Sequence, residues 1–490
     1  MNEKPITISA SALELVKECN ASNDNREPSP ITKGPHLFRW TQLKRAIIDW
    51  FVNQADEDFV IKKVETEQFS MFDELQKRIV SEAFANFRSI YPRSKAEINP
   101  EGPKKIVFKE INNQQYGIEA YFQFEIIDKN TSEYIKLKTG RVDEDKLSKA
   151  IFTKEKLENE TSYTASTKEP DLIENETIDN HEEVIEEYFE IYEEFLNNPT
   201  KKTPNINCSF KCNRPSKCGQ FPVVGGIDVG RYDRGITVTK TNLRNLEGCE
   251  RRAAWNLLYG IPKDSENDYG EFGIKFHNAA GKMLVTTKDR NDPAEVERLK
   301  KMTKDEDDEI QKKILEKYKE LLERLKGYKN LELTLNEYPV GFTSVPDGIR
   351  VLSDYRIKES KVFTSFIGQA DLLGRLDGSP IVIELKTGKK QEDDSADLTE
   401  AELYAFGVWK LFAEKEKKDV TVLHIYLNEA KDEPVERIFG EEEFKTIEKK
   451  FHSYAEKIAS WDPLDALSVN HSQGNCCDYC EFKQTCAEFR

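Results

Sequence analysis

Three charged residues stand on two consecutive apolar segments in the second half of this sequence. Asp371 lies in FIGQADLLGRL, and Glu384 and Lys386 lie two residues apart in the next segment, IVIELKT. Side chains alternate along a β-strand, so Glu384 and Lys386 share one face of the predicted strand. Charges on an apolar strand are costly unless they are paired or bound to a metal. The pattern therefore fits either a cross-strand salt bridge or a site for Mg²⁺ or Mn²⁺, which carboxylate oxygens favour.

The two alternatives differ in their chemistry. A hard cation at this position would polarise a phosphoryl oxygen and lower the pKa of a bound water. Lys386 is placed to orient that water or to offset the charge that develops on the reacting phosphorus centre. A salt bridge would have no chemical role.

Eight of the nine cysteines fall into two similar sets. Clustered cysteines in a reducing compartment point to metal or redox sites rather than disulfides. Four thiolates suit zinc or an iron–sulfur cluster, and spacing alone does not distinguish them. Cys476 is adjacent to the second set and is interpreted as a bystander. The first set is Cys19, Cys208, Cys212 and Cys218, and the second is Cys249, Cys477, Cys480 and Cys486.

The two halves of the sequence repeat these landmarks in the same order. ITISASALELVKEC, which ends at Cys19, is similar to ITVTKTNLRNLEGC, which ends at Cys249. YIKLKTGR at 134–141 is similar to IVIELKTGK at 381–389, and a cysteine triplet closes each half. We interpret the pattern as an internal duplication, with a boundary in the Gly-rich stretch 219–235; chance recurrence of short motifs is the alternative.

Hydrophobic periodicity predicts an α/β architecture, with a central mixed sheet flanked by helices in each half. The polar stretch 155–180 is predicted to be a flexible loop. In the second half, helices are expected at 242–259, 271–285, 306–326, 398–414 and 441–460, and strands at 331–336, 349–355, 362–368, 370–376, 380–385 and 420–427. In the first half, helices are expected at 41–52, 72–90 and 181–197, and strands within 104–127 and at 133–138.

The charged pattern resembles the signature of the PD-(D/E)XK nuclease superfamily, and ELKTGK resembles its RecB-type branch. Gly273-x3-His277 on a predicted helix resembles the early histidine motif of that branch, although a histidine taken alone is more often an ordinary surface or core residue. EAELY at 400–404 resembles the Q-x3-Y helix motif of the branch, with Glu400 in place of Gln and Tyr404 at its end. The resemblance implies two tandem restriction-endonuclease-like domains and a DNA nuclease. It further implies that His277, Asp371 and Glu384 bind Mg²⁺ or Mn²⁺ and that Lys386 and Tyr404 take part in catalysis.

The second set of cysteines also carries a resemblance. One cysteine before the histidine and C-x2-C-x5-C near the end of the sequence resemble the iron–sulfur nucleases of the AddB and CRISPR-associated exonuclease type. This implies a [4Fe–4S] cluster on Cys249, Cys477, Cys480 and Cys486, with zinc as the alternative. The centre would act as a structural staple, because a cross-link that closes so long a loop stabilises by roughly 4–5 kcal/mol in the chain-entropy model.

The first half lacks the residues that such chemistry needs. Lys136 stands where the second half has Glu384, and Ala120 stands where it has Asp371 when both are counted from the preceding glycine. No histidine corresponds to His277, because His36 lies much nearer its cysteine. We therefore expect residues 1–220 to form a degenerate, non-catalytic nuclease-like domain that binds DNA or packs on the other half, residues 221–235 to form a linker, and residues 236–490 to form the active domain. The first cysteine set is a possible second centre, although its x3 gap departs from x2.

Bulk properties narrow the class of protein. The net charge of −17 counts against an extended basic surface, but acidic blocks such as 181–195 and 305–309 account for much of it. There is no membrane-length apolar run and no signal peptide, which predicts a cytoplasmic protein. DNA is the expected partner, and unwinding would require a helicase, ATPase or other repair or defence protein, because no P-loop motif is present. A non-catalytic nucleic-acid-binding or partner scaffold and a zinc-bound structural protein are the other readings.

Overall fold

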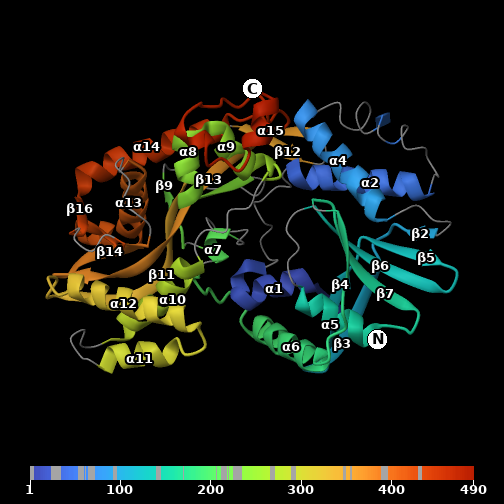
Figure 1. Ribbon diagram of the computed structural model, residues 1–490, viewed down its shortest axis with the longest axis horizontal. Helices are drawn as coiled ribbons and strands as arrows, with labels where there is room; N and C mark the ends of the chain where they lie inside the picture. The colour runs from blue at the N-terminus through green and yellow to red at the C-terminus, as the bar shows by residue number, and fades with distance from the viewer. Residues whose placement is uncertain are drawn as a thin grey trace.

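The protein, as a computed structural model, consists of two α/β halves (Figure 1). The structure describes residues 5–23, 35–52, 60, 62–63, 72–91, 97–139, 145–168, 170–205, 207–210, 218, 220–224, 234–264, 271–287, 294–345, 349–353, 356–387, 395–428 and 433–490. Across that part of the chain, none of the helices combines the length and the apolar character that a bilayer crossing requires.

An eight-stranded mixed sheet forms the centre of the second half. Six of its strands follow the order β16-β15-β14-β13-β11-β9, and the other two, β10 and β12, also pair with β13. The long strand β13 carries β11 along one edge, and on its other edge β10 is followed by β14. Strand β9 lies within the predicted linker 221–235 and pairs with β11. The strands are β9 (Val223–Val224), β10 (Arg234–Thr239), β11 (Leu331–Ser344), β12 (Ile349–Ser353), β13 (Arg356–Leu376), β14 (Ser379–Lys386), β15 (Val420–Tyr426) and β16 (Val435–Phe439).

Helices cover both faces of this sheet, because its inner strands are apolar on both sides. Alternate residues of β14 enter two different cores: Ile381, Ile383 and Leu385 pack towards α10, α11 and α12, whereas Val382 packs towards α8, α13 and α14. The helices are α8 (Lys240–Gly248), α9 (Glu250–Ala254), η3 (Trp255–Tyr259), α10 (Glu271–Thr286), α11 (Ala294–Met302), α12 (Asp308–Leu325), α13 (Ser395–Val408), η4 (Trp409–Ala413), η5 (Glu414–Glu416), α14 (Glu441–Ala459), η6 (Asn475–Cys477) and α15 (Lys483–Glu488).

The first half divides its strands between two sheets, β1-β4-β3 and β2-β5-β6-β7-β8. Its helices also build one core on each side, with α1, α5 and α6 on one side and α2 and α4 on the other. The strands are β1 (Ile6–Ser9), β2 (Glu97–Asn99), β3 (Lys104–Ile111), β4 (Gln114–Tyr121), β5 (Phe124–Asp128), β6 (Thr131–Lys138), β7 (Glu160–Ser166) and β8 (Asp171–Glu174). The helices are α1 (Ala10–Glu18), η1 (Asn20–Asn23), α2 (Pro35–Val52), α4 (Glu74–Ile90), α5 (Lys146–Glu155), α6 (His181–Asn197) and α7 (Asn207–Phe210).

The pairing pattern of the first half matches that of the second for every strand of the second half except β9 and β12. β1 is parallel to β4 as β10 is to β13, β6 is parallel to β7 as β14 is to β15, and β8 is antiparallel to β7 as β16 is to β15. The long strands β11 and β13 correspond to two shorter strands each, β2 with β3 and β4 with β5. This agreement supports the proposed duplication beyond the short sequence motifs.

The mixed α/β class predicted from the sequence is confirmed, and two local predictions are wrong. The polar stretch 155–180 contains β7 and β8 rather than a loop, because the small polar side chains of Ser162, Thr164 and Ser166 are themselves buried on an inner strand. The predicted strands 362–368 and 370–376 are one continuous strand, β13. Both errors arose where polar residues within a strand were taken as interruptions.

Polar contacts join the two halves near helices α2, α4 and α15 (Figure 1). The buried guanidinium of Arg39 on α2 donates to the carbonyl oxygens of Tyr259 and Gly260, at 2.6 and 2.7 Å. Gln76 on α4 donates to the carbonyl oxygen of Leu464, at 3.0 Å. These contacts hold the first half against two segments of the second, the end of η3 and the chain around Leu464. Losing a buried hydrogen bond to a charged group is costly, so the Arg39 contacts stabilise this packing.

Candidate active site

Asp371 and Glu384 lie side by side at the centre of the second sheet, on β13 and β14. Asp371 is 5% exposed and Glu384 is fully buried. The Oδ2 atom of Asp371 accepts a hydrogen bond from the backbone N–H of Leu385 at 2.7 Å, and Glu384 Oε1 accepts one from the N–H of Asp371 at 3.2 Å. These two bonds fix both carboxylates against the backbone of the opposite strand, so they are preorganised.

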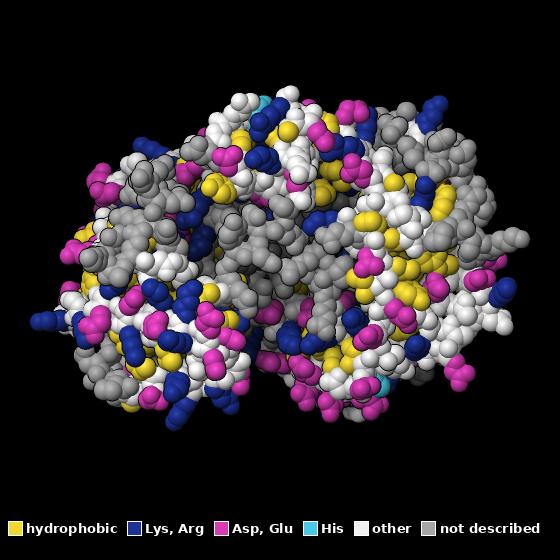
Figure 2. All heavy atoms as spheres, viewed as in Figure 1, with side chains coloured by type: hydrophobic (Ala, Val, Ile, Leu, Met, Phe, Trp, Pro, Cys, Tyr) yellow, Lys and Arg dark blue, Asp and Glu magenta, His cyan; other side chains and the backbone are white. Residues whose placement is uncertain are grey.

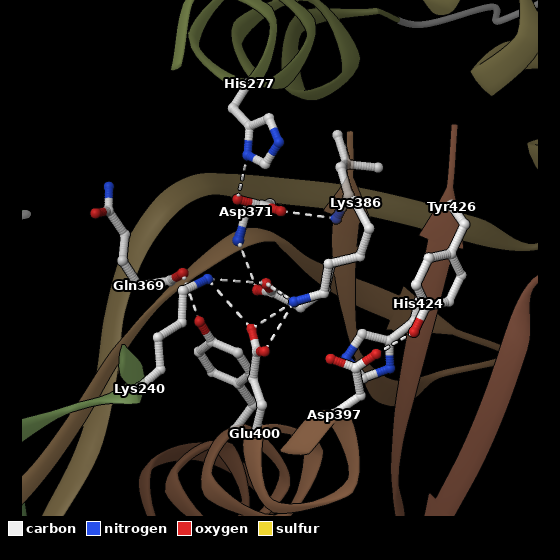
Figure 3. A network of polar contacts seen from close by, with 12 residues as sticks. Lys240, His277, Gln369, Asp371, Lys386, Asp397, Glu400, His424 and Tyr426 are labelled. Carbon is white, nitrogen blue, oxygen red and sulfur yellow. Dashed lines mark hydrogen bonds and ion pairs between the residues drawn. The ribbon is translucent and has the colours of Figure 1, made fainter. Parts of the chain in front are cut away.

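His277 approaches Asp371 from helix α10. Its Nδ1 atom lies 2.9 Å from Asp371 Oδ1, as Figure 3 shows. Helix α10 packs closely here, as a Cβ atom added at Gly273 would lie 3.1 Å from Oγ1 of Thr387, the residue that follows β14. The histidine and the aspartate named from the sequence are therefore brought together, and Gly273 permits the close packing.

A third potential ligand, Glu337 on β11, was not anticipated from the sequence. Ligand atoms of His277, Glu337 and Asp371 all lie within 4.8 Å of one another. Glu337 has a φ angle of 51°, in the left-handed region that is rare for a residue within a strand, and it accepts a hydrogen bond from Gln369. Two carboxylates and an imidazole at this separation suit a divalent cation, so the residues present fit the metal that the fold class implies.

Burial and charge act in opposite directions on the two central acids. Burial raises the pKa of Asp371, but the hydrogen bond and charge of His277 and the charge of Lys240 outweigh it, so the pKa lies below its ordinary value. Burial and the neighbouring Asp371 carboxylate instead hold the pKa of Glu384 well above its ordinary range. Such divergent pKa values within one acidic pair are typical of sites that perform chemistry or bind metal.

Glu400 on α13 is the anchor of a cationic cluster beside Glu384. It is 2% exposed and accepts hydrogen bonds from Lys386 Nζ at 2.8 and 2.9 Å, from Lys240 Nζ at 3.2 Å and from Arg244 Nη2 at 2.6 Å. Figure 3 shows Lys240 and Lys386 approaching the Glu400 carboxylate from opposite sides. Burial raises the pKa of Glu400, but the three cations lower it well below its ordinary value. Glu rather than Gln at this position therefore balances the two basic groups on α8.

Lys240 was also missed from the sequence, although a signal for it exists. It is the first residue of α8, and its Nζ atom lies 3.3 Å from Glu384 Oε2. Burial lowers the pKa of Lys240, but the charge of Glu384 and further anionic neighbours raise it well above its ordinary value. In the repeated motif, Lys240 replaces Ala10 of ITISA. Comparison of the two halves at that position would have identified it.

Tyr404 is placed to hold the strand that carries Asp371. It is fully buried on α13, and its hydroxyl donates to the carbonyl oxygen of Gln369 at 2.8 Å. Gly368 makes room for it, because a Cβ atom there would lie 2.5 Å from Tyr404 Cε1. Tyr404 therefore fixes the part of β13 that immediately precedes Asp371.

His424 on β15 closes the site beyond Lys386. It is fully buried, and burial together with the charge of Lys386 lowers its pKa to about 4. Its Nδ1 atom lies 3.2 Å from Arg437 Nη1, and its buried Nε2 atom has no hydrogen-bond partner within the described part of the chain. A neutral imidazole beside Lys386 adds no positive charge to the cluster.

The structure brings the described cysteines of each set to one cavity. Cys249, Cys477, Cys480 and Cys486 line a cavity of about 20 Å³ with Cys476. Cys19, Cys208 and Cys218 line one of about 40 Å³ in the first half, and Cys212 lies outside the described residues. Backbone N–H groups point at the sulfurs, as Phe482 does towards Cys480 at 3.4 Å and Gln220 towards Cys218 at 3.3 Å. Such N–H donors stabilise metal-bound thiolates, so the donor set fits a thiolate-bound centre.

Comparison with known proteins gives one family assignment. The sequence model of the PD-(D/E)XK nuclease superfamily matches residues 237–487 of the 490-residue chain. A solved structure, "Crystal structure of SSO0001", is 18% identical and aligns with 46% of this chain and 100% of its own, with a TM-score of 0.21. So loose a superposition supports no conclusion about this chain. No curated protein matches the sequence.

Proposed function

The chain belongs to the PD-(D/E)XK nuclease superfamily, and from that premise we propose that its second half is a metal-dependent nuclease that hydrolyses phosphodiester bonds in DNA. The observation that carries this proposal is the convergence of Asp371, Glu384 and Lys386 with His277 and Glu337 at one buried site. A non-catalytic scaffold has no need of buried, mutually repelling carboxylates, whose burial is costly.

The chain's own residues divide the task. His277, Asp371 and Glu337 would hold the cation, with Glu384 beside them, and the bound cation would polarise a phosphoryl oxygen and acidify a water. The ammonium of Lys386 is held by Glu400 and lies 3.9 Å from Glu384, where it can orient the attacking water and stabilise negative charge. Tyr404 keeps the Asp371 segment in position.

The substrate preference belongs to the same proposal. We infer an exonuclease, or an enzyme that prefers ends or single strands, acting in DNA repair, recombination or defence, on the basis of the RecB-type motif. The cysteines Cys249, Cys477, Cys480 and Cys486 would hold a [4Fe–4S] cluster, or zinc in its place, as a structural tie. Cys19, Cys208, Cys212 and Cys218 would hold a second centre, and the cavity that three of them share supports this.

A cleavage assay tests the proposed function. Single-stranded, duplex and tailed DNA are incubated with the full chain in Mg²⁺, in Mn²⁺ and in EDTA. We expect metal-dependent cleavage by the wild type and none by Lys386→Ala. The matched control is Lys410→Ala, which removes a partly exposed lysine on η4. Cleavage at the wild-type rate by folded Lys386→Ala protein would contradict the assignment, and absence of cleavage by the wild type would favour a scaffold.

A further inference from the structure

The first half contains a polar cavity of about 210 Å³ at the place that corresponds to the active site of the second half. Strand registers establish the correspondence: Phe124 pairs with Ile135 as Leu372 pairs with Ile383. The difference in residue number between matched residues of the two halves is the same along β4, β5 and β6. The matched residues, first half then second, are Gln123 and Asp371, Lys136 and Glu384, Lys138 and Lys386, and Thr164 and His424.

These registers correct one sequence-based match. Counting from a glycine placed Ala120 opposite Asp371, whereas the strand pairing places Gln123 there. The Gln123 side chain accepts a hydrogen bond from the N–H of Leu137 at 2.7 Å, as Asp371 does from Leu385. The conclusion that the first half lacks this acid is unchanged, and Ala120 is a core residue.

The cavity has acquired positive charge in place of the two carboxylates. Lys136, Lys138 and Lys149 line it together with one acid, Asp145, which accepts from Lys136 Nζ at 2.5 Å. Within the described part of the chain, Lys138 and Lys149 have no ion pair. Burial lowers the pKa of Lys136, Asp145 opposes this, and the charges of Lys138 and Lys149 lower it further. Three ammonium groups around one cavity repel one another unless an anion lies between them.

Neutral polar groups complete the wall of the cavity. Asn175 donates to Ser162 Oγ at 3.2 Å, and Thr164 Oγ1 donates to Asn175 Oδ1 at 3.1 Å. Because Ser162 accepts from Asn175, its own O–H is available as a donor. Ammonium groups and a hydroxyl around a cavity of this size form a donor set for a tetrahedral oxyanion.

The surroundings favour a nucleic-acid strand over a free ion as the source of that anion. The chain carries a net charge of −17, and Figure 2 shows Lys and Arg side chains mixed with Asp and Glu over the face it presents. A polyanion gains little electrostatic binding free energy from such a mixed surface. A cavity that concentrates positive charge would therefore contribute a large share of the binding free energy of a strand. In the matching place of the second half, the proposed nuclease would hold a phosphate through its cation.

We propose that this cavity binds a phosphate group of a DNA strand directly through Lys136, Lys138 and Lys149, without a metal and without cleaving it. The inference rests on the proposed function for the identity of the polymer. Lys136 at the position of Glu384 supplies directly the positive charge that a metal supplies in the active half. Gln123 and Lys136 together leave no pair of carboxylates to hold a cation.

Anisotropy of labelled single-stranded DNA, measured on the full chain in EDTA over a range of salt concentrations, tests the proposal. We expect Lys138→Ala/Lys149→Ala to weaken binding at least about tenfold and to reduce the slope of log K against log salt by about 0.7, the contribution of one phosphate contact on a single strand. Lys138→Arg/Lys149→Arg should restore binding. Lys154→Ala/Lys156→Ala removes the same charge from exposed positions outside the cavity and should change binding less than about twofold.

A second variant tests for a gain in DNA-binding affinity, which misfolding cannot produce. Asp145→Asn keeps an oxygen to accept the N–H of Ser148 at the start of α5 but removes the one negative charge in the cavity, so it should tighten binding severalfold. Unchanged affinity and salt slope in folded Lys138→Ala/Lys149→Ala protein would overturn the proposal. So would stabilisation of the wild type by inorganic phosphate that the same double variant abolishes while strand affinity is unaffected.

The proposed function is judged separately, by metal-dependent cleavage. Strand binding in EDTA that depends on the cavity lysines, with no cleavage in Mg²⁺ or Mn²⁺, would refute the nuclease and support the cavity. Cleavage with unchanged binding in the lysine variant would refute the cavity and support the nuclease.

Discussion

The two halves of the molecule keep one hydrogen bond and differ in the charge of the group that accepts it. Asp371 Oδ2 accepts from Leu385 N–H in the second half, and Gln123 Oε1 accepts from Leu137 N–H in the first, both at 2.7 Å. The fold therefore requires an acceptor at this position but not a carboxylate. The negative charge of Asp371 has no counterpart at this position in the first half, in line with the role proposed for Asp371 in holding a cation.

The largest predicted effect comes from making the second half resemble the first at this position. Asp371→Asn keeps an oxygen that accepts from Leu385 N–H and removes the charge. We expect cleavage to fall by at least about 10²–10³-fold, as when one preorganised electrostatic contact to the transition state is lost. The free energy of unfolding should change by less than about 1 kcal/mol, because the hydrogen bond survives. Initial cleavage rates and thermal melting of the same preparation measure both.

Wild-type cleavage by Asp371→Asn would show that the two halves differ in something other than catalysis. The reverse change, Gln123→Glu in the first half, is the control. It should produce no cleavage, because Lys136 still stands where Glu384 is needed.

The cysteine cavities allow a second comparison between the halves. Cys249 and Cys19 occupy the same place, each as the extended residue that ends the first helix of its half. If each set of cysteines binds a centre, Cys480→Ser and Cys208→Ser should each destabilise by about 2–5 kcal/mol, as loss of a covalent tie does. Iron, sulfide and zinc content, the visible absorbance of anaerobic protein and thermal melting measure the two centres.

Cys476→Ser is the matched control, and it should melt as the wild type does. Zinc in place of iron would refute the iron–sulfur cluster but leave the proposed structural cross-link through the cysteines. A Cys480→Ser protein with wild-type melting would refute the tie in the second half. The same result for Cys208→Ser alone would confine the centre to the second half.

Much of the second site could be predicted from its sequence, because its acids and lysine lie on two neighbouring strands. Asp371, Glu384 and Lys386 are joined by local pairing of β13 with β14, which alternation along strands predicts. Glu337 could not be found in this way, because it reaches the site from β11 through an unusual backbone angle. In the first half, counting residues failed at Ala120 because only the pairing of β1 with β4 fixes the register.

The halves also differ at His277, which has no matching histidine in the first half. Its substitution should lower the cleavage rate less than Asp371→Asn does. We expect His277→Ala to lower cleavage by about 10–100-fold, the range seen when a group that positions a metal site is removed. The loss of cleavage activity in His277→Ala should be greatest at limiting metal concentration. Asp371 and Glu337 remain as ligands, so a high metal concentration can still fill the site. Cleavage rates across a Mn²⁺ titration, with Lys275→Ala on the same helix as control, measure it. An unchanged rate and metal dependence would make His277 an ordinary surface residue.

The smallest predicted effect concerns acid stability, and it is specific to the first half. Glu160 on β7 occupies the position that Val420 fills on β15. Its carboxylate accepts from Lys105 Nζ at 2.5 Å, Leu157 N–H at 2.9 Å and Tyr134 Oη at 3.0 Å. Burial raises the pKa of Glu160, but these contacts outweigh it, so the pKa lies below its ordinary value of 4.5.

A lowered pKa in the folded state means that Glu160 stabilises the protein above about pH 4.5 and that this contribution is lost as the pH falls through its folded pKa. Glu160→Gln should therefore cost about 1–2 kcal/mol at pH 7, the size of a hydrogen bond to a charged group. The difference from the wild type should shrink below pH 4.5, where the wild-type carboxylate also becomes neutral. Denaturant unfolding at several pH values measures it, with exposed Glu158→Gln as control. A difference that stays constant down to low pH would mean that Glu160 contributes through packing, as Val420 does in the second half, and not through its charge.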